Sequence, residues 1–121
     1  MSTIHPTAGT NLAVLVGTLT RAPEPRSLPS GDEVLSLELT IRSDGLPTDS
    51  VPVAWFNPNG SAGSIEVGDE LLVVGRVRRR FFQAGGTTQS RTEVVASRVV
   101  PTRKAAAATK ALAAALATID P

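Results

Sequence analysis

The 121-residue sequence contains no cysteine and no tyrosine, and it has only one tryptophan, three phenylalanines and one histidine. The absence of cysteine excludes disulfide bonds, thiolate metal sites and cysteine nucleophiles, and it agrees with a reducing compartment. With His5 as the only histidine and no phosphate-loop glycine pattern, no catalytic constellation can be assembled. We therefore expect a protein that is not an enzyme and that uses no cofactor or metal.

Long apolar runs are also missing from the sequence. No apolar segment is long enough to span a membrane, and the N-terminus lacks the charged and apolar regions of a signal peptide. We therefore expect a cytoplasmic protein that has no membrane partner.

Acidic residues are scarce in the C-terminal half of the chain. The formal net charge is only +1, but Glu93 is the only acid among the arginines and lysines between residues 76 and 104. Most of the other acids lie before residue 71. One side of the folded protein is therefore expected to be basic, although the chain as a whole is nearly neutral.

Alternating polar and apolar residues, separated by turn-forming residues, predict five strands. The predicted strands are Asn11–Arg21, Glu33–Arg42, Val51–Phe56, Asp69–Phe82 and Arg91–Val100. The proline-rich residues 22–31 predict a loop, and Ala84-Gly85-Gly86 predicts a hairpin turn. Pro52 predicts that the third strand is an edge strand or carries a bulge, because proline donates no hydrogen bond to a ladder. The pattern as a whole predicts an all-β fold, a small five-stranded barrel.

The composition divides the chain into three parts. Residues 1–10 form a polar leader, residues 11–101 form the barrel domain, and residues 102–121 form an alanine-rich segment of high helix propensity. Leu112, Leu116 and Ile119 share a narrow stripe of this segment. Three alternatives stay open: the stripe docks on the barrel, it pairs with another chain, or it belongs to a fluctuating tail.

The fourth predicted strand carries a row of cations that ends in an aromatic ring. Arg76, Arg78, Arg80 and Phe82 share one face, because successive side chains of a strand point to opposite sides. Such a row suits phosphate neutralisation and base stacking. The alternative is a solvated strand face that happens to use arginine.

The other parity of the same strand predicts the side that faces the core. Phe81 is expected to be the core member of the Phe81–Phe82 pair. Arg79 has the same parity and is expected to leave the core at the end of the strand.

Several segments, in their order along the chain, resemble the bacterial single-stranded DNA-binding protein family. The segments are Asn11–Leu19, Ala22–Arg26 followed by Pro29–Gly31, Val53–Trp55, Val67–Asp69, Gly75–Arg78 and Thr92–Ala96. The resemblance implies a five-stranded oligonucleotide-binding (OB) barrel, usually assembled as a homotetramer. It also implies a nucleoid-associated protein that covers single-stranded DNA without sequence preference during replication, recombination or repair.

The resemblance also implies which residues contact the nucleic acid. It places stacking on Trp55, through Val53-Ala54-Trp55, and on Phe82, which follows Gly75–Arg78. For Trp55 the alternative is core packing, and Phe56 replaces it if the strand shifts by one residue. The expected phosphate contacts are Arg76, Arg78 and Arg80, with Arg42 and Arg91 as further candidates that could instead pair with nearby acids.

The sequence departs from the family pattern in its aromatic residues and at its C-terminal end. Two family aromatic positions hold no ring, and the alanine-rich end contains Asp120 as its only acid. We therefore expect a short or specialised member that does not recruit repair enzymes through an acidic tip. An oligomerising OB-fold interaction protein with weak or no DNA binding, and a single-stranded RNA binder, remain as alternatives.

Overall fold

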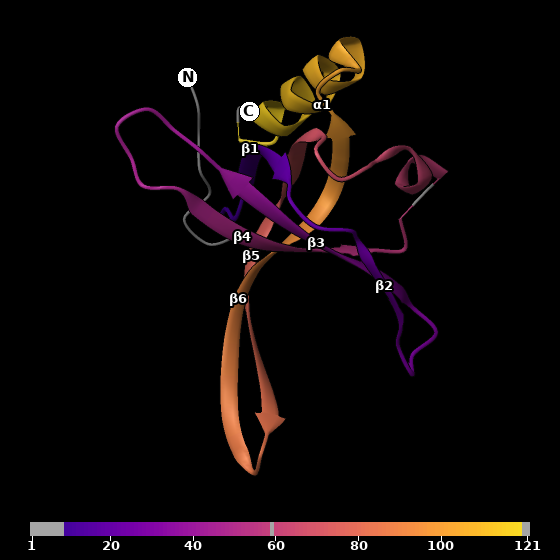
Figure 1. Ribbon diagram of the computed structural model, residues 1–121, viewed down its shortest axis with the longest axis vertical. Coiled ribbons are helices and arrows are strands. Elements are labelled where there is room, and N and C mark those ends of the chain that lie inside the picture. The colour runs from indigo at the N-terminus through magenta and orange to yellow at the C-terminus, as the bar shows by residue number, and fades with distance from the viewer. Residues whose placement is uncertain (1–8, 59, 120–121) are drawn as a thin grey trace.

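The computed structural model describes residues 9–58 and 60–119, so most of the predicted leader, with His5, lies outside the described residues. Six strands and one C-terminal helix make up most of the described chain (Figure 1). The elements are β1 (Ala13–Leu19), β2 (Glu24–Ser27), β3 (Glu33–Ile41), β4 (Asp49–Phe56), the short 3₁₀ helix η1 (Gly60–Ser64), β5 (Glu70–Ala84), β6 (Thr87–Pro101) and α1 (Ala105–Ala117).

The strands form one sheet in the order β1-β5-β6-β4-β3-β2. An additional pairing of β1 with β3, through Thr18 opposite Thr40 and Leu19 opposite Leu39, joins the two sides of the sheet into a ring of five strands. This arrangement is consistent with the OB fold, and it confirms the predicted all-β fold class.

A sixth strand, β2, lies in the segment that the prolines predicted to be a loop. β2 pairs only with β3, with Pro25 opposite Leu35, and it therefore forms an edge of the sheet. Proline is tolerated there because one side of an edge strand forms no ladder. The predicted edge position or bulge of the Pro52 strand is wrong, since β4 lies between β3 and β6 and its register with β3 runs through Glu38 opposite Pro52 without a shift. Its parallel ladder with β6 covers only Val53–Trp55, which leaves Pro52 outside it.

The interior of the barrel is filled by the apolar side of the alternating strands. Leu19, Leu39, Leu71 and Val73 are completely buried. They pack in one cluster with other buried residues, namely Leu35, Leu37, Val53, Trp55, Ile65, Val94, Ala96 and Val99. The opposite side of the strands faces solvent or the groove described below, except where Leu72 and Val100 are buried against α1.

The distal halves of β5 and β6 leave the barrel as a two-stranded arm, here defined as residues 78–93 (Figure 1). Gly85 and Gly86 form the two-residue turn with φ angles of +59° and +81°, which confirms the predicted hairpin. Phe81, which was predicted to face the core, is 65% exposed. The prediction is wrong because at this point the strand has already passed beyond the barrel, so no core lies against the face that carries Phe81.

A β-bulge lies where the arm joins the barrel. Val74 pairs with Arg98 and Gly75 with Ala96, so Ser97 is an extra residue on β6. A Cβ atom at residue 75 would lie 2.2 Å from the carbonyl oxygen of Val95, so only glycine allows the strands to approach here. The bulge bends β6 at this point and shifts the core-facing parity along the strand.

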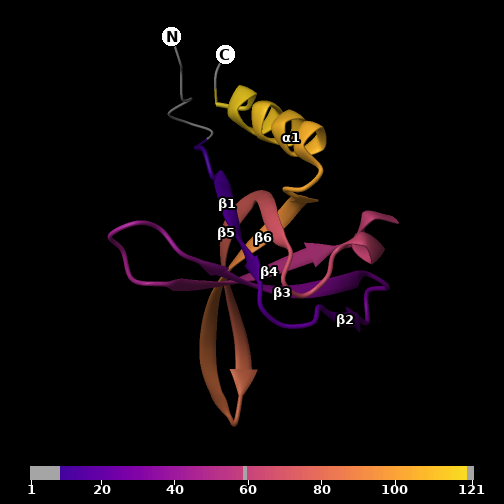
Figure 2. The same ribbon diagram turned by 45° about the horizontal axis from the view of Figure 1, so that its top comes forward.

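Helix α1 lies at the end of the barrel opposite the arm, as Figure 2 shows. It docks through small side chains, because Ala111 and Ala115 are buried and Ala111 packs against Leu72 and Val100. The leucine stripe of the sequence does not make this contact, since Leu112 is 37% and Leu116 50% exposed.

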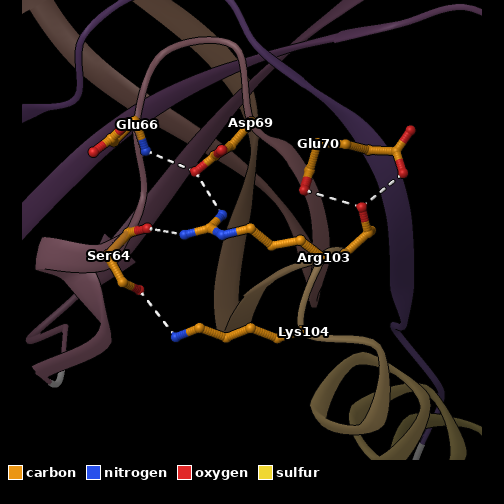
Figure 3. Close-up of polar contacts among 7 residues, drawn as sticks. Ser64, Glu66, Asp69, Glu70, Arg103 and Lys104 are labelled. Carbon is orange, nitrogen blue, oxygen red and sulfur yellow. Dashed lines mark hydrogen bonds and ion pairs between the residues drawn. The ribbon is translucent and has the colours of Figure 1, made fainter.

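The segment before α1 is held by polar contacts to the stretch from the end of η1 to the start of β5 (Figure 3). Arg103 Nη1 lies 3.0 Å from Asp69 Oδ2, and Arg103 Nη2 donates to the Ser64 carbonyl oxygen at 2.6 Å. The Thr102 hydroxyl donates to Glu70 Oε1 at 2.8 Å. These contacts fix the direction in which the chain leaves β6 and enters the helix.

Ala111→Asp is expected to release α1 from the barrel and to lower the free energy of unfolding by about 1 to 3 kcal/mol. The reason is that a carboxylate at this 2% exposed position cannot be buried without a partner. Ala113→Asp is the matched control, because residue 113 is exposed on the same helix. Urea unfolding followed by circular dichroism measures both, and equal losses would show that α1 does not dock through Ala111.

Candidate nucleic-acid interface

A groove of about 550 Å³ runs along the outer face of the barrel beside the arm. Its walls come from β2, from the polar side of β3, from the even-numbered side of β4 and from the near end of the arm. The charged residues that line it are Arg21, Glu24, Arg26, Glu38, Arg78, Arg80, Arg91 and Glu93. Five arginines against three glutamates leave the groove with a formal net charge of +2.

One buried carboxylate orders three of these arginines. Glu93 is 6% exposed, and its Oε2 lies 2.5 Å from Arg78 Nη2 and 3.6 Å from Arg80 Nε. Its Oε1 lies 3.9 Å from Arg91 Nε. The three guanidiniums share one counter-charge, so positive charge remains at the surface of the cluster.

Two aromatic rings lie next to arginines of this cluster. The Cζ atom of Arg78 is 5.4 Å from the ring centre of Phe56, and the Cζ atom of Arg80 is 5.2 Å from that of Phe82. Both rings are half-buried. Each pair therefore combines a flat apolar face with a cation, which is the chemistry that binds a base together with its phosphate.

Trp55, which was expected to stack a base, lies in the core. The side chain belongs to the main hydrophobic cluster, and the residue is only 5% exposed. Trp55 pairs with Leu35 and Phe56 with Val34, so the two neighbours point to opposite faces of β4. The structure therefore agrees with the alternative prediction, in which Trp55 packs in the core and Phe56 faces the groove.

The other predicted phosphate contacts are separated in space. Arg78, Arg80 and Arg91 meet in the groove, whereas Arg76 lines a different hollow of about 430 Å³ beside α1, together with Arg98. Arg42 follows the end of β3 and is absent from the lining of the groove.

Sequence reasoning missed five charged residues of the groove, namely Arg21, Glu24, Arg26, Glu38 and Glu93. Arg26 belongs to β2, the strand that was predicted to be a loop, and Arg21 precedes that strand and lies 3.9 Å from Glu38. Glu93 stood out in the sequence as the only acid in a basic region, but its role as a shared counter-charge was not predicted. That isolation was the signal that could have identified it.

The described residues contain no cluster of three or more histidine, aspartate or glutamate side chains placed to hold a metal ion. Within the same residues, no helix has the length and apolar character needed to cross a membrane.

A barrel that carries a basic groove and ring–guanidinium pairs is the architecture of an oligonucleotide-binding protein. The sequence matches the family model described as the Single-strand binding protein family over residues 10–102, which is most of the chain. The chain therefore belongs to this family, and membership supports single-stranded DNA binding in general. A comparison with curated proteins gives no match.

Proposed function

We propose that the groove and the even-numbered face of the arm bind single-stranded DNA without sequence preference. The observation that carries the proposal is the convergence of Arg78, Arg80 and Arg91 beside the half-buried ring of Phe56. Phosphates meet the arginines and bases stack on Phe56 and Phe82. By covering exposed strands in this way, the protein serves DNA replication, recombination or repair.

Stacking on these rings favours single strands over a duplex. A ring that lies flat against a base needs an unpaired base, because in a duplex both faces of each base are already stacked. Every base offers such a face, so the contacts tolerate any sequence.

The proposal extends to self-association and location. β1 pairs with β3 only through Thr18 and Leu19, so the opposite side of Ala13–Gly17 has no strand partner within the described residues. A free strand edge supports association between copies. We include a homotetramer and a cytoplasmic, nucleoid-associated location in the proposal, on the basis of the family resemblance.

Titration of fluorescently labelled oligothymidine, oligouridine and duplex DNA at several salt concentrations tests the proposed function. Oligothymidine is expected to bind more tightly than the duplex, with an affinity that falls as salt rises because counterions are released from the strand. Equal affinity for the duplex, or no binding at low salt, would favour an OB-fold interaction protein. Tighter binding of oligouridine would favour an RNA partner.

Replacing Arg80 and Arg91 together by glutamine is expected to reduce the salt slope by roughly 0.7 for each phosphate that is no longer neutralised. Binding should weaken by about 2 kcal/mol or more, because each arginine offers the phosphate a charge-assisted hydrogen bond. Arg78 is kept so that the buried Glu93 retains its closest partner.

The matched control replaces Arg76 and Arg98, which carry the same total charge but line the hollow beside α1. This second variant should keep the slope and affinity of the parent protein. If both pairs of substitutions have the same effect, the groove is not the binding site and only the overall charge matters.

A further inference from the structure

The odd-numbered face of the arm carries a second ring–guanidinium pair that lies outside the groove. Phe81 is 65% exposed, and the Cζ atom of Arg79 lies 5.4 Å from its ring centre. Arg79 and Phe81 alternate with Arg80 and Phe82 along β5, so the arm carries one such pair on each face. No core residue of the barrel covers the second pair.

The cross-strand neighbours hold this pair in place. On the same face Phe81 lies opposite Ser90, and Arg79 lies opposite Thr92. Arg79 donates to the Ser90 hydroxyl from Nε at 3.2 Å and from Nη2 at 3.0 Å. The guanidinium is therefore oriented over the ring before any ligand arrives, which reduces the entropy lost on binding.

The charge of Arg79 is uncompensated. Among the described residues Arg79 forms no ion pair, whereas Arg78, Arg80 and Arg91 all share Glu93. The cross-strand pairs of this face from residue 79 to the turn contain no acid. An exposed cation without a counter-charge beside an exposed ring suits a phosphate and a base.

A contact between two copies of the protein through this face is the alternative way to bury Arg79 and Phe81. A two-fold contact buries the same patch of both copies, so it would bring two uncompensated Arg79 charges into one interface. No acid on this face is available to compensate them. Charge thus favours an anionic ligand over a second copy.

We propose that single-stranded DNA leaving the groove continues around the arm and stacks a base on Phe81, with a neighbouring phosphate on Arg79. The arm then binds the strand with both faces, and long strands gain contacts that short ones cannot make. This inference rests on the proposed function, because the strand must first occupy the groove.

Oligothymidines of two lengths separate the two faces, since one OB fold covers about 4 to 16 nucleotides. We choose about 8 nucleotides to fill the groove and about 30 to reach the far side of the arm. Phe81→Ala should bind the short strand as the parent does and the long strand at least about fivefold more weakly. Phe82→Ala, its neighbour on the other face, should weaken both.

Arg79→Gln provides a second variant that keeps the fold without the exposed cation. Its salt slope should fall by roughly 0.7 for the long strand and stay unchanged for the short one. Parent-like binding of the long strand by Phe81→Ala and Arg79→Gln would overturn the inference while leaving the groove intact. A change of molecular mass in light scattering, with DNA binding unaltered, would also overturn it by identifying the face as a contact between copies. If the parent protein bound neither strand, the proposed function itself would fail.

Discussion

Trp55→Ala is expected to lower the free energy of unfolding by about 3 to 5 kcal/mol, the range for removing a large aromatic side chain from a core. Trp55 is 5% exposed and packs with residues from several strands of the barrel. A methyl group in its place leaves a cavity that the surrounding strands cannot close without losing their pairing. Urea unfolding of the parent and variant proteins gives the difference directly.

The neighbouring substitution, Phe56→Ala, is the matched control. Phe56 is half-buried and faces the groove, so its loss should cost less stability and should weaken DNA binding by about 1 to 3 kcal/mol. Trp55→Ala should instead lose more stability and little DNA affinity, provided that binding is measured under conditions in which the variant is still folded.

Tryptophan fluorescence gives an independent test, because Trp55 is the only tryptophan. Emission from a buried indole should be blue-shifted and should not respond when oligothymidine binds. Strong quenching by DNA, together with a stable Trp55→Ala protein, would mean that Trp55 faces the nucleic acid and that the register of β4 is shifted by one residue.

The positions of the five longer strands could be predicted because runs of β-branched and aliphatic residues, in part alternating with polar ones, lie between turn-forming residues. β3 is the clearest case, with its leucines inside and polar residues outside. The hairpin turn was equally clear, since Gly85 and Gly86 supply the positive φ angles of a two-residue loop. Local sequence therefore determined most of the order of elements.

The faces of β4 and of the arm could not be predicted in the same way. In β4, Trp55 and Phe56 are adjacent aromatics, so either register gives a plausible core and the choice depends on pairing with Leu35. In β5, alternation continues beyond the barrel, where no core exists to bury Phe81. Periodicity identifies two faces of a strand, but only the tertiary structure shows which face is covered.

Part of the candidate site was visible in the sequence as the row Arg78, Arg80 and Phe82. The contribution of Arg26 was not predicted, because the prolines around it, including Pro25, indicated a loop where the structure has the edge strand β2. Arg76 belonged to the same row but lies beside α1, because β5 curves around the barrel. Spacing along one strand could not reveal either effect.

Glu93→Gln is expected to tighten the binding of single-stranded DNA by about tenfold at low salt. Glu93 is the shared counter-charge of Arg78, Arg80 and Arg91, and its removal raises the net charge of the groove by one unit. One unit charge at the distance of a bound phosphate contributes about 1 to 2 kcal/mol near a protein surface at low salt. The glutamine amide oxygen can still accept from Arg78, so the direction of that guanidinium is retained.

The same substitution should reduce stability, because the buried group loses its charge-assisted hydrogen bonds. We expect the free energy of unfolding to fall by about 1 to 3 kcal/mol, less than for a fully buried pair, since Arg78 and Arg80 remain 28% and 37% exposed. Glu66→Gln is the control, because it removes the same charge from an exposed loop outside the groove. Weaker DNA binding by the folded Glu93→Gln protein would show that Glu93 chiefly holds the arginines in place. Tighter binding, with a salt slope steeper by up to roughly 0.7, would show that it competes with the phosphate for them.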